Sequence, residues 1–429
     1  MIYIIGGGIT GMAIAYNFLK KNLKVTIIEK NKTLGGLADS IKINNTYIEK
    51  YYHHIFKGDD KFLSLVKELG LEDKLIWNKT KMGFYCNEKV YNFGTPTSLL
   101  KFKPLDFRDR IRFGKTILSF RKSEFTDDLD NISAEEILIK KSGKEAYEKL
   151  WKPLLKAKFG YRYQEASAAW LLGRIKPRAE SRTTGMSSEL LGYMTGGFHL
   201  FFEELKNKIL DMGGTIIERK TVSKILVKNE KVIGIIINGK KIRTDKVIYT
   251  GSVSELTKIC KFNKEYSDKL NSINYQAILC VLLEIKEKLS DIYWLNIADD
   301  NIVFGGVIEH TNFVSKSFYG NNMVYLFNYL DRKDPKFKLP DKEIIEIFLK
   351  DLKKIFPDFN EDKIVSFHVF KDPFATPIYD KGFGKRKPDY ITPINGLFIA
   401  GMTDVYPFDR NMDGAVRIAE ELTNLINED

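Results

Sequence analysis

The first thirty residues constrain the fold of this chain most tightly. A short apolar run at residues 2–5 is followed at once by Gly6-Gly7-Gly8-Ile9-Thr10-Gly11, and then by a helical pattern that continues through Leu19. A second strand pattern at residues 24–28 ends in Glu29. Strand, glycine turn, helix, strand and acid in this order predict one β–α–β unit that binds the diphosphate of a dinucleotide.

Each residue type in the turn has a physical reason. Gly6 permits a tight turn, Gly8 lets a pyrophosphate approach the backbone, and Gly11 lets the helix pack closely on the strand. At the start of the helix, around Ile9 and Thr10, unpaired backbone N–H groups are available to phosphate oxygens. The turn is therefore expected to contact the cofactor directly.

Residues 29–40 favour FAD as that cofactor. Glu29, with Lys30 beside it, is placed to accept the ribose hydroxyls, and a carboxylate there suits the unphosphorylated ribose of FAD or NAD rather than NADP. A paired glycine follows, which lets the chain bend back over a bound dinucleotide; the residues concerned are Gly35, Gly36, Leu37 and Ala38. Glu29 followed by this glycine pair resembles the flavin amine oxidase, protoporphyrinogen oxidase and phytoene desaturase superfamily. The resemblance implies FAD and a Rossmann-like fold.

The last forty residues carry a second segment of the same kind. Residues 396–401 have the pattern of a buried strand that ends in Gly401, and Met402 follows it. A helix is expected to begin after a loop, at Met412, Asp413, Gly414 and Ala415. In the superfamily that the chain resembles, such a segment closes the cofactor site, with the helix N-terminus facing the flavin. An NAD dehydrogenase has no need of a second dinucleotide segment so far from the first. The presence of both segments therefore favours FAD over NAD as the cofactor.

A middle segment, residues 213–251, is expected to form strands and turns that complete the site. It resembles the superfamily's middle FAD segment, in which the residue matching Val222 contacts adenine through its backbone. Thr250 and Gly251 end the last of these strands. A plain β-meander without a cofactor role is the alternative.

Two local features resemble UDP-galactopyranose mutase instead. His54-Ile55-Phe56 is similar to a segment beside the flavin in that enzyme, and Tyr406 with Met412-Asp413 is similar to its C-terminal element. The mutase has arginine after its last glycine, whereas this chain has Met402. This departure counts against a mutase, which stands as an alternative.

Five residues are candidates for contact with the substrate: His54, Lys158, Arg174, Arg178 and Tyr379. The mutase-like context places His54 near the flavin, and Tyr379 is expected to line the pocket over it. Lys158 lies in a segment that resembles protoporphyrinogen-oxidase-like proteins and could polarise a water molecule or bind an anionic substrate. Arg174 and Arg178, four residues apart on one helix face, could hold a phosphate or carboxylate. The plainer alternative for each is a packing or surface role.

Three functional hypotheses follow. The leading one is an FAD-dependent oxidoreductase, an oxidase, dehydrogenase or desaturase that transfers a hydride from a small-molecule, lipid or sugar-linked substrate to flavin N5. The second is a non-redox mutase or isomerase of the UDP-galactopyranose mutase type, acting on a nucleotide sugar. The third is a flavin-binding protein without catalysis. Because one fold hosts many functions, the resemblance alone cannot choose among them.

The predicted fold class is α/β, a Rossmann-like FAD-binding domain with an inserted substrate domain of mixed sheet and helices. We expect the FAD-binding domain to comprise residues 1–75, 190–255 and 373–429. The substrate domain would comprise residues 76–189, largely helical, and residues 256–372. A hairpin is expected at Lys81 to Phe93.

Composition limits the partners. The net charge is +12, and a basic balance can indicate nucleic acid, an anionic membrane or an acidic substrate, or can reflect lysine-rich composition alone. No RNA-binding signature, zinc-finger spacing or basic tail is present in the sequence, so nucleic acid is not expected. The three cysteines are scattered and odd in number, which favours a cytoplasmic setting. Histidines, cysteines and carboxylates lack metal-ligand spacing, so no metal is expected.

Residues 101–125 form a basic amphipathic segment in which lysines and arginines interleave with Phe107, Ile111 and Leu118. Such a segment can lie on an anionic membrane surface, so peripheral membrane contact is one interpretation. A solvated helix with its apolar side in the core is the plainer alternative. No run approaches the roughly 18 apolar residues that a membrane span requires.

Overall fold

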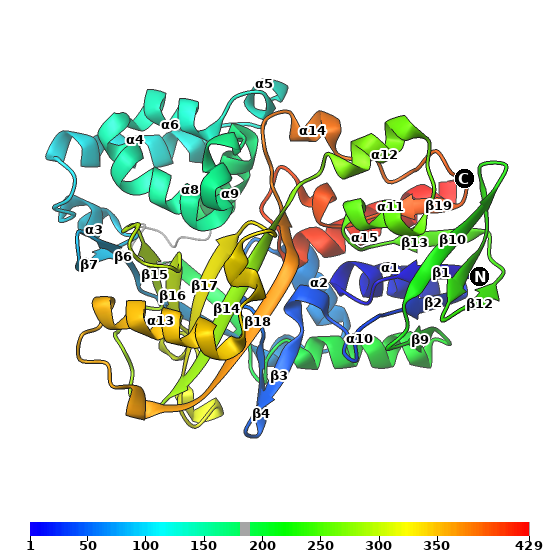
Figure 1. Ribbon diagram of the computed structural model, residues 1–429, viewed down its shortest axis with the longest axis horizontal. Coiled ribbons are helices and arrows are strands. Elements are labelled where there is room, and N and C mark those ends of the chain that lie inside the picture. The colour runs from blue at the N-terminus through cyan, green and yellow to red at the C-terminus, as the bar shows by residue number, and fades with distance from the viewer. Residues whose placement is uncertain (181–188, 429) are drawn as a thin grey trace.

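The computed structural model describes residues 1–180 and 189–428. With 41% helix and 28% strand, it confirms the predicted α/β class. Figure 1 shows a small sheet with its helices at one end of the molecule, and a larger sheet and a group of helices at the other.

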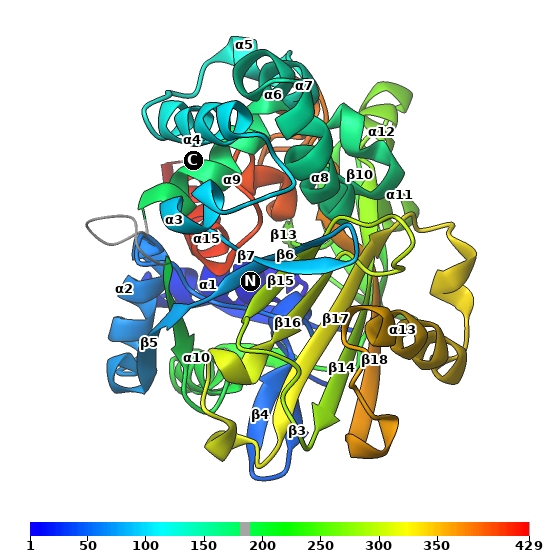
Figure 2. The same ribbon diagram turned by 90° about the vertical axis from the view of Figure 1, so that its left-hand side faces the viewer.

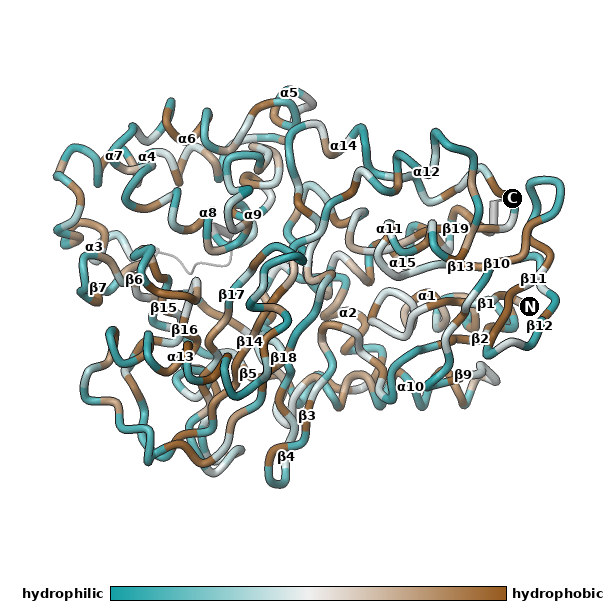
Figure 3. The backbone as a smooth tube through the Cα atoms, in the orientation of Figure 1, coloured by the Kyte–Doolittle hydropathy of each residue, from teal (hydrophilic) through white to brown (hydrophobic). Residues whose placement is uncertain are grey.

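The small sheet has five parallel strands. Their order is β19 (Leu397–Ile399), β13 (Lys246–Tyr249), β1 (Ile2–Ile5), β2 (Val25–Ile28) and β9 (Thr215–Ile217). Ile4 of the central strand pairs with Ile27 on one side and Ile248 on the other. The apolar runs at residues 2–5 and 24–28 form strands whose two faces are both covered, one by helices and the other mainly by the strands of residues 222–242. Strands buried on both faces need side chains that avoid water; Figure 3 shows their hydrophobic character.

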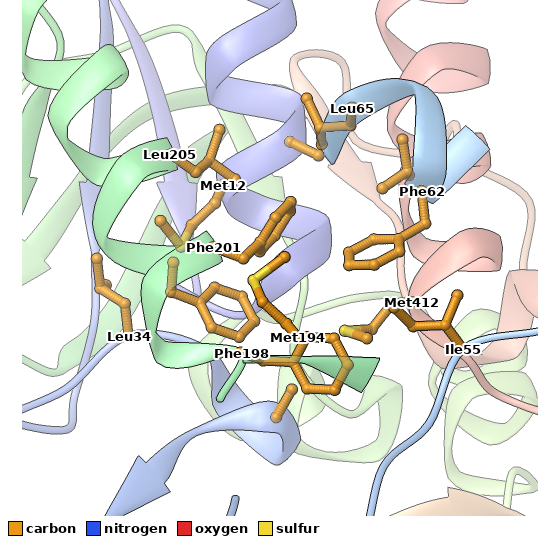
Figure 4. Close-up of a cluster of buried hydrophobic side chains, with 14 of the residues drawn as sticks. Met12, Leu34, Ile55, Phe62, Leu65, Met194, Phe198, Phe201, Leu205 and Met412 are labelled. Carbon is orange, nitrogen blue, oxygen red and sulfur yellow. The ribbon is translucent and has the colours of Figure 1, made fainter. Parts of the chain in front are cut away.

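Four helices surround the start of the chain: α1 (Ile9–Lys20), α2 (Asp60–Glu68), α10 (His199–Asp211) and α15 (Met412–Glu428). Their apolar faces form one buried cluster, in which Met12, Phe62, Phe201 and Met412 point toward a common centre (Figure 4). The first and last helices of the chain therefore pack against each other.

An antiparallel three-stranded sheet packs on the other face of the small sheet and comprises β10 (Val222–Lys228), β11 (Lys231–Ile237) and β12 (Lys240–Ile242). Asn229 and Glu230, with φ of 51° and 56°, form the turn between the first two strands. The strands predicted within residues 213–251 are therefore present.

The large sheet has seven strands. Their order is β18 (Ile364–Pro377), β14 (Tyr275–Ile285), β17 (Asn322–Leu330), β16 (Gly306–Glu309), β15 (Trp294–Ile297), β6 (Met82–Cys86) and β7 (Lys89–Phe93). The last two strands form the hairpin predicted between Lys81 and Phe93. α13 (Asp341–Ile355) covers part of one face (Figure 2), and every residue of β14 is buried.

The second group of helices follows the hairpin along the chain. It comprises α3 (Pro96–Leu100), α4 (Phe107–Arg121), α5 (Asp127–Asp130), α6 (Ala134–Ser142), α7 (Lys144–Ala146), α8 (Lys152–Phe159) and α9 (Ala168–Glu180). The side chain of Ser133 accepts a hydrogen bond from the backbone N–H of Glu136 at 3.1 Å, which caps α6.

Shorter elements connect these parts. They are the strand pair β3 (Ser40–Ile43) and β4 (Thr46–Glu49), the pair β5 (Leu75–Thr80) and β8 (Glu189–Met194), and the helices α11 (Val253–Ile259), α12 (Lys264–Asn271) and α14 (Phe383–Arg386). β18 runs through the predicted domain boundary at residue 373, and the boundary at residue 189 directly follows residues outside the described part of the chain. The division into domains stays a prediction. Among the described helices, none is both long and apolar enough to cross a bilayer.

Candidate active site

The predicted glycine segments meet at the carboxyl ends of β1, β13 and β19. Gly8 forms a bridge with Gly35, whose N–H donates to the carbonyl of Gly7 at 2.9 Å. A Cβ on Gly36 would lie 3.3 Å from the Cα of Gly8. The paired glycine thus folds back against the first turn, and Leu37 and Ala38 follow it in a short helical turn.

The glycines of this region differ in how much space lies around each Cα. A Cβ on Gly11 would lie 2.1 Å from the carbonyl of Gly6, and one on Gly6, where φ is +118°, would lie 2.4 Å from Thr250 Oγ1. Packing therefore requires both glycines. A Cβ on Gly8, by contrast, would meet only the Cα of Gly36 at 3.9 Å, and its φ of −73° suits any residue.

Gly401 resembles Gly8 in this respect. A Cβ there would come no closer than 3.6 Å, to the carbonyl of Thr250, and the backbone is extended. At Gly8 and Gly401 the protein itself leaves room for a side chain, so the fold does not demand glycine. A pyrophosphate lying against the bare backbone would fill this space, which fits a dinucleotide.

Glu29 is buried at the end of β2 with Lys30 exposed beside it. Its Oε2 accepts from the N–H of Gly7 at 2.7 Å, and its Oε1 accepts from the N–H of Asn31 at 2.7 Å. The N–H of Lys220 donates to the carbonyl of Glu29 at 2.9 Å, so the chain just before Val222 lies against this residue. Each carboxylate oxygen keeps a second lone pair for a ribose hydroxyl.

Thr250 and Gly251 join the middle segment to the first. The N–H of Thr250 donates to the carbonyl of Ile5 at 3.0 Å, and its hydroxyl donates to the same carbonyl at 3.1 Å. The neighbouring strand continues this edge, because the N–H of Ala400 donates to the carbonyl of Tyr249 at 3.0 Å. Three distant parts of the chain therefore form one rim.

The helix predicted at residues 412–415 is present as the start of α15, with Gly414 and Ala415 in its first turn. Met412 lies on the wall of a cavity described below. The carboxylate of Asp413 accepts from the N–H groups of Lys61 at 2.7 Å and Phe62 at 3.0 Å. Asp413 therefore caps α2, a contact that the sequence did not indicate.

A cavity of about 150 Å³ lies between the large sheet, helices α8 and α9, and the loop that precedes α15. Its residues are Tyr52, His53, His54, Phe56, Asp59, Leu154, Ala157, Lys158, Gly173, Arg174, Pro177, Arg178, Trp294, Asn296, Phe327, Tyr329, Phe408, Asp409, Arg410, Asn411 and Met412. Four of the five predicted substrate residues lie on this wall.

Lys158 and Arg174 share one carboxylate. The Nζ of Lys158 lies 3.0 Å from Asp409 Oδ1, and Arg174 binds the other oxygen of Asp409. Burial lowers the pKa of Lys158, and Asp409 opposes that shift. Burial works against ionisation of Asp409, but Lys158 and Arg174 together hold its pKa well below its usual range. The Lys158 side chain is only 7% exposed, so the alternative of a surface role for it is wrong.

Tyr329, at the end of β17, is the centre of a second group. Arg410 donates through Nη2 to the Tyr329 hydroxyl at 3.1 Å, and the Tyr52 hydroxyl lies 3.5 Å away. The ammonium of Lys158 lies 5.0 Å from the centre of the Tyr329 ring. Burial alone would raise the pKa of Tyr329, but the two cations outweigh it and the pKa is lowered.

Arg178 and His54 occupy the opposite part of the wall. The guanidinium of Arg178 lies 5.5 Å from the ring centre of Phe56 and 5.8 Å from that of Trp294. Burial, reinforced by Arg178, lowers the pKa of His54 well below its usual value. His54 is therefore neutral near pH 7 and adds no positive charge.

Tyr379 is not on the cavity wall. It is fully buried, and its hydroxyl donates to the carbonyl of Met402 at 2.8 Å. Its ring packs on Phe383 and Tyr406, with ring centres 5.0 and 5.5 Å away. The expectation that Tyr379 lines the pocket is corrected: the end of β18 turns its side chain into the core.

Sequence reasoning missed several residues of the wall, among them Tyr52, Tyr329, Asp409 and Arg410. Asp409 and Arg410 carried a signal, since adjacent opposite charges lie in a loop between two segments expected to be buried. The two tyrosines carried none, because neither the loop position of Tyr52 nor the strand position of Tyr329 shows that its side chain meets a cavity.

A parallel sheet whose carboxyl edge is opened by Gly8 and Gly401, beside a cavity lined by charged and aromatic side chains, defines a dinucleotide-binding flavoprotein of the oxidoreductase class. Its cofactor is FAD. The chain belongs to the family described as flavin containing amine oxidoreductase, which it matches over residues 9–421. The superfamily resemblance predicted from the glycine segments is thereby confirmed.

Known proteins of several kinds are similar to this chain. The 15-cis-phytoene desaturase of an Oncidium hybrid cultivar is 22% identical over 97% of this chain and 75% of its own length. An oxidoreductase structure from Methanosarcina mazei superposes with a TM-score of 0.77 at 20% identity and covers 99% of both chains. A reduced UDP-galactopyranose mutase has a TM-score of 0.79 at 16% identity, covering 100% of this chain and 95% of its own. At such identities the structural matches show the fold alone.

Proposed function

We propose that this flavoprotein oxidises an organic substrate, either a small molecule or a lipid- or sugar-linked one, in the cavity bounded by α8, α9 and the large sheet. The observation that carries the proposal is the chain from Gly401 to Met412. This segment begins at the glycine-lined cofactor edge and ends on the cavity wall, through Asp409 and Arg410. One short loop thus joins the place for FAD to the place for a substrate.

The flavin, when bound, takes up two electrons from the substrate. The protein's own residues bind, orient and exclude water. Arg178 holds the polar part of the substrate, while Trp294 and Phe327 cover its apolar part. The Tyr329 hydroxyl, held by Arg410, is placed to take up or release a proton.

The test is anaerobic mixing of the purified yellow protein with candidate substrates, followed by the absorbance of the flavin. Loss of the oxidised flavin band with one equivalent of product supports the proposal. Tight flavin binding with no bleaching by any amine, porphyrinogen, polyene or sugar-linked compound would contradict it and favour the non-catalytic flavin-binding protein.

A mutase or isomerase is a second candidate, favoured by the position of the mutase-like segment. His54 and Phe56 lie on the cavity wall, and Arg178 stacks on Phe56. A mutase would turn over a nucleotide sugar only after prior reduction of the protein, with no net consumption of electrons. Turnover of the oxidised protein with electrons released would exclude this candidate.

We also propose that α4 contacts an anionic lipid surface. Phe107, Ile111 and Leu118 are 64%, 39% and 44% exposed and, at spacings of four and seven, share one helix face. Exposed Lys115 and Lys122 flank this apolar stripe, and basic side chains beside exposed apolar ones suit anionic headgroups.

The stripe leads toward the cavity. Phe125, just beyond α4, packs on Phe408 of the cavity wall with ring centres 5.3 Å apart. A lipid-linked substrate would then have a short path from the bilayer to the site. A cytoplasmic setting, with peripheral membrane contact, remains our proposal for location; the three cysteines are buried and unpaired.

A further inference from the structure

The cavity wall has more positive than negative groups. Four basic side chains line it, Lys158, Arg174, Arg178 and Arg410, together with two carboxylates, Asp59 and Asp409. Both histidines of the wall are neutral near pH 7, since burial lowers the pKa of His53 to about 4 and that of His54 well below its usual value. The histidines therefore leave the balance of charge unchanged.

The two carboxylates do not neutralise the wall. Asp409 is already shared between Lys158 and Arg174. Burial raises the pKa of Asp59 to about 7, and its oxygens accept from the N–H of Phe56 at 2.8 Å and from the amide of Asn411 at 3.2 Å. Near neutral pH Asp59 is thus only partly charged, and its hydrogen-bonding partners are not the basic residues.

One N–H group among the four basic side chains of the wall has no hydrogen-bond acceptor in the described part of the chain. The Nε of Arg410 is buried and makes no hydrogen bond within the described part of the chain, although its Nη2 donates to Tyr329. A buried guanidinium N–H without an acceptor is costly. An anionic oxygen at this place would satisfy it.

Apart from Asn296 and Asn411, the remaining wall is apolar or aromatic. Phe56, Trp294, Phe327 and Phe408 face the cavity with Leu154 and Met412. A ligand that fits both parts has an anionic group and an apolar or aromatic body. A protonated amine, the substrate type that the family description suggests, would meet a surplus of positive charge.

Resting on the function proposed above, we infer that the cavity selects an anionic substrate, a carboxylate or a phosphate ester with an apolar body, and rejects protonated amines. The oxygens of the anion lie between Arg178 and Arg410, and the apolar body lies against Trp294 and Phe327. Arg174 and Lys158, held by Asp409, add to the positive potential without releasing their partner.

The experiment compares three probes with the same apolar chain: octanoate, octyl phosphate and octylamine. Each is titrated calorimetrically into the FAD-loaded protein at pH 7.5 and low ionic strength. We expect at least one of the two anions to bind at least tenfold more tightly than octylamine. The tighter anion identifies the headgroup as carboxylate or phosphate.

Two variants locate the binding. Arg178→Gln should weaken binding of the preferred anion at least tenfold, whereas Arg178→Lys, which keeps the charge, should weaken it less. Arg243→Gln is the matched control, because it removes the same charge from an exposed position that is not on the cavity wall.

The outcomes separate this inference from the function on which it rests. The absorbance spectrum of the same sample, taken first, shows whether FAD is bound, and a colourless protein would overturn the proposed function. A yellow protein that binds octylamine as tightly as the anions, or binds none of the three probes, would overturn the anionic substrate alone. Equal weakening by Arg178→Gln and Arg243→Gln would also overturn it.

Discussion

Two glycines three positions apart meet different physical needs. At Gly11 a Cβ would collide with the backbone of Gly6, whereas at Gly8 the protein leaves the space open. Both glycines belong to one sequence motif. The atoms around them show that the fold requires Gly11, whereas only a ligand would require Gly8.

Gly8→Val should therefore give a folded protein that retains no FAD, because the new side chain occupies the path of the pyrophosphate. Gly11→Val should instead fail to fold, because its Cβ would lie 2.1 Å from a carbonyl oxygen. Circular dichroism and flavin absorbance of both purified proteins test the pair. A yellow Gly8→Val protein would contradict the assignment.

Glu29→Ala should weaken FAD binding by on the order of 1–3 kcal/mol, through lost hydrogen bonds to the ribose. The variant also leaves the N–H groups of Gly7 and Asn31 without their acceptor, so the protein should lose stability without FAD as well. Fluorescence titration of the apoprotein with FAD measures the affinity. An unchanged affinity would mean that another residue contacts the ribose.

Glu49 should make folding stability depend on pH. It is fully buried, and its oxygens accept from the Tyr193 hydroxyl at 2.6 Å and the N–H of Phe198 at 2.7 Å. Burial raises the pKa of Glu49 to about 7 in spite of these hydrogen bonds. Because the folded pKa is higher than the unfolded one, the stabilising contribution is present below about pH 4.5 and is lost as the pH rises to about 7.

Relative to Glu49→Gln, the natural protein should therefore lose about 3 kcal/mol of unfolding free energy between pH 4.5 and 8, at about 1.4 kcal/mol per pKa unit. Urea unfolding at several pH values, with FAD in excess, measures the difference. Glu346→Gln, at an exposed position of α13, is the control. Parallel pH curves for the natural protein and Glu49→Gln would contradict the prediction.

The residues that sequence reasoning placed correctly are those whose role depends on neighbours along the chain. The turn at residues 6–11 and the strand that ends in Glu29 are local patterns. Tyr379 was misplaced because its partner, Met402, is set by tertiary packing. The contact of Asp413 with the start of α2 was not predicted for the same reason. Asp409 joins Lys158 and Arg174 across some 240 residues, a pairing that no spacing shows.

Among the elements, α4 has the clearest division of faces. Phe113 and Phe120 are buried, while Phe107, Ile111 and Leu118 lie in solvent. The sequence showed a basic amphipathic segment but could not show that some of its apolar residues stay exposed. The buried and the exposed apolar residues both occur at helical spacing.

Replacing Phe107, Ile111 and Leu118 together with serine should reduce binding to vesicles that contain anionic lipid at least tenfold, because the exposed apolar area is lost. Co-sedimentation with phosphatidylserine and phosphatidylcholine vesicles measures it. The control replaces Val365 and Phe367, which are exposed on β18. Equal binding of the natural protein to both lipids, or no effect of the triple change, would contradict the proposed contact.

At the scale of the whole molecule, the cofactor edge depends on three distant segments. The order β19, β13, β1 places the last strand two positions from the first, with the middle segment between them. The sequence predicted these strands and the α/β class, but not the order of the large sheet, where β6 pairs in parallel with β15 from a region some 210 residues away.

Because bound FAD would bridge these segments, it should stabilise the whole fold. At a free concentration one hundred times its Kd, FAD is expected to add about 2.7 kcal/mol to the free energy of unfolding. Thermal or urea unfolding of the apoprotein with increasing FAD measures this gain, and Gly8→Val should show none. If added FAD did not change the free energy of unfolding of the natural apoprotein, the bridging arrangement would be contradicted.

The position of β19 also bears on biosynthesis. At about 5–20 residues per second, a ribosome needs on the order of 20–90 s for the residues of this sequence. Gly401 is synthesised near the end of that time, long after β1. FAD is then expected to bind only after residue 401 has been synthesised. A chain that stops before Gly401 should stay colourless, so the yellow colour of a preparation would report the fraction of molecules whose translation has passed Gly401.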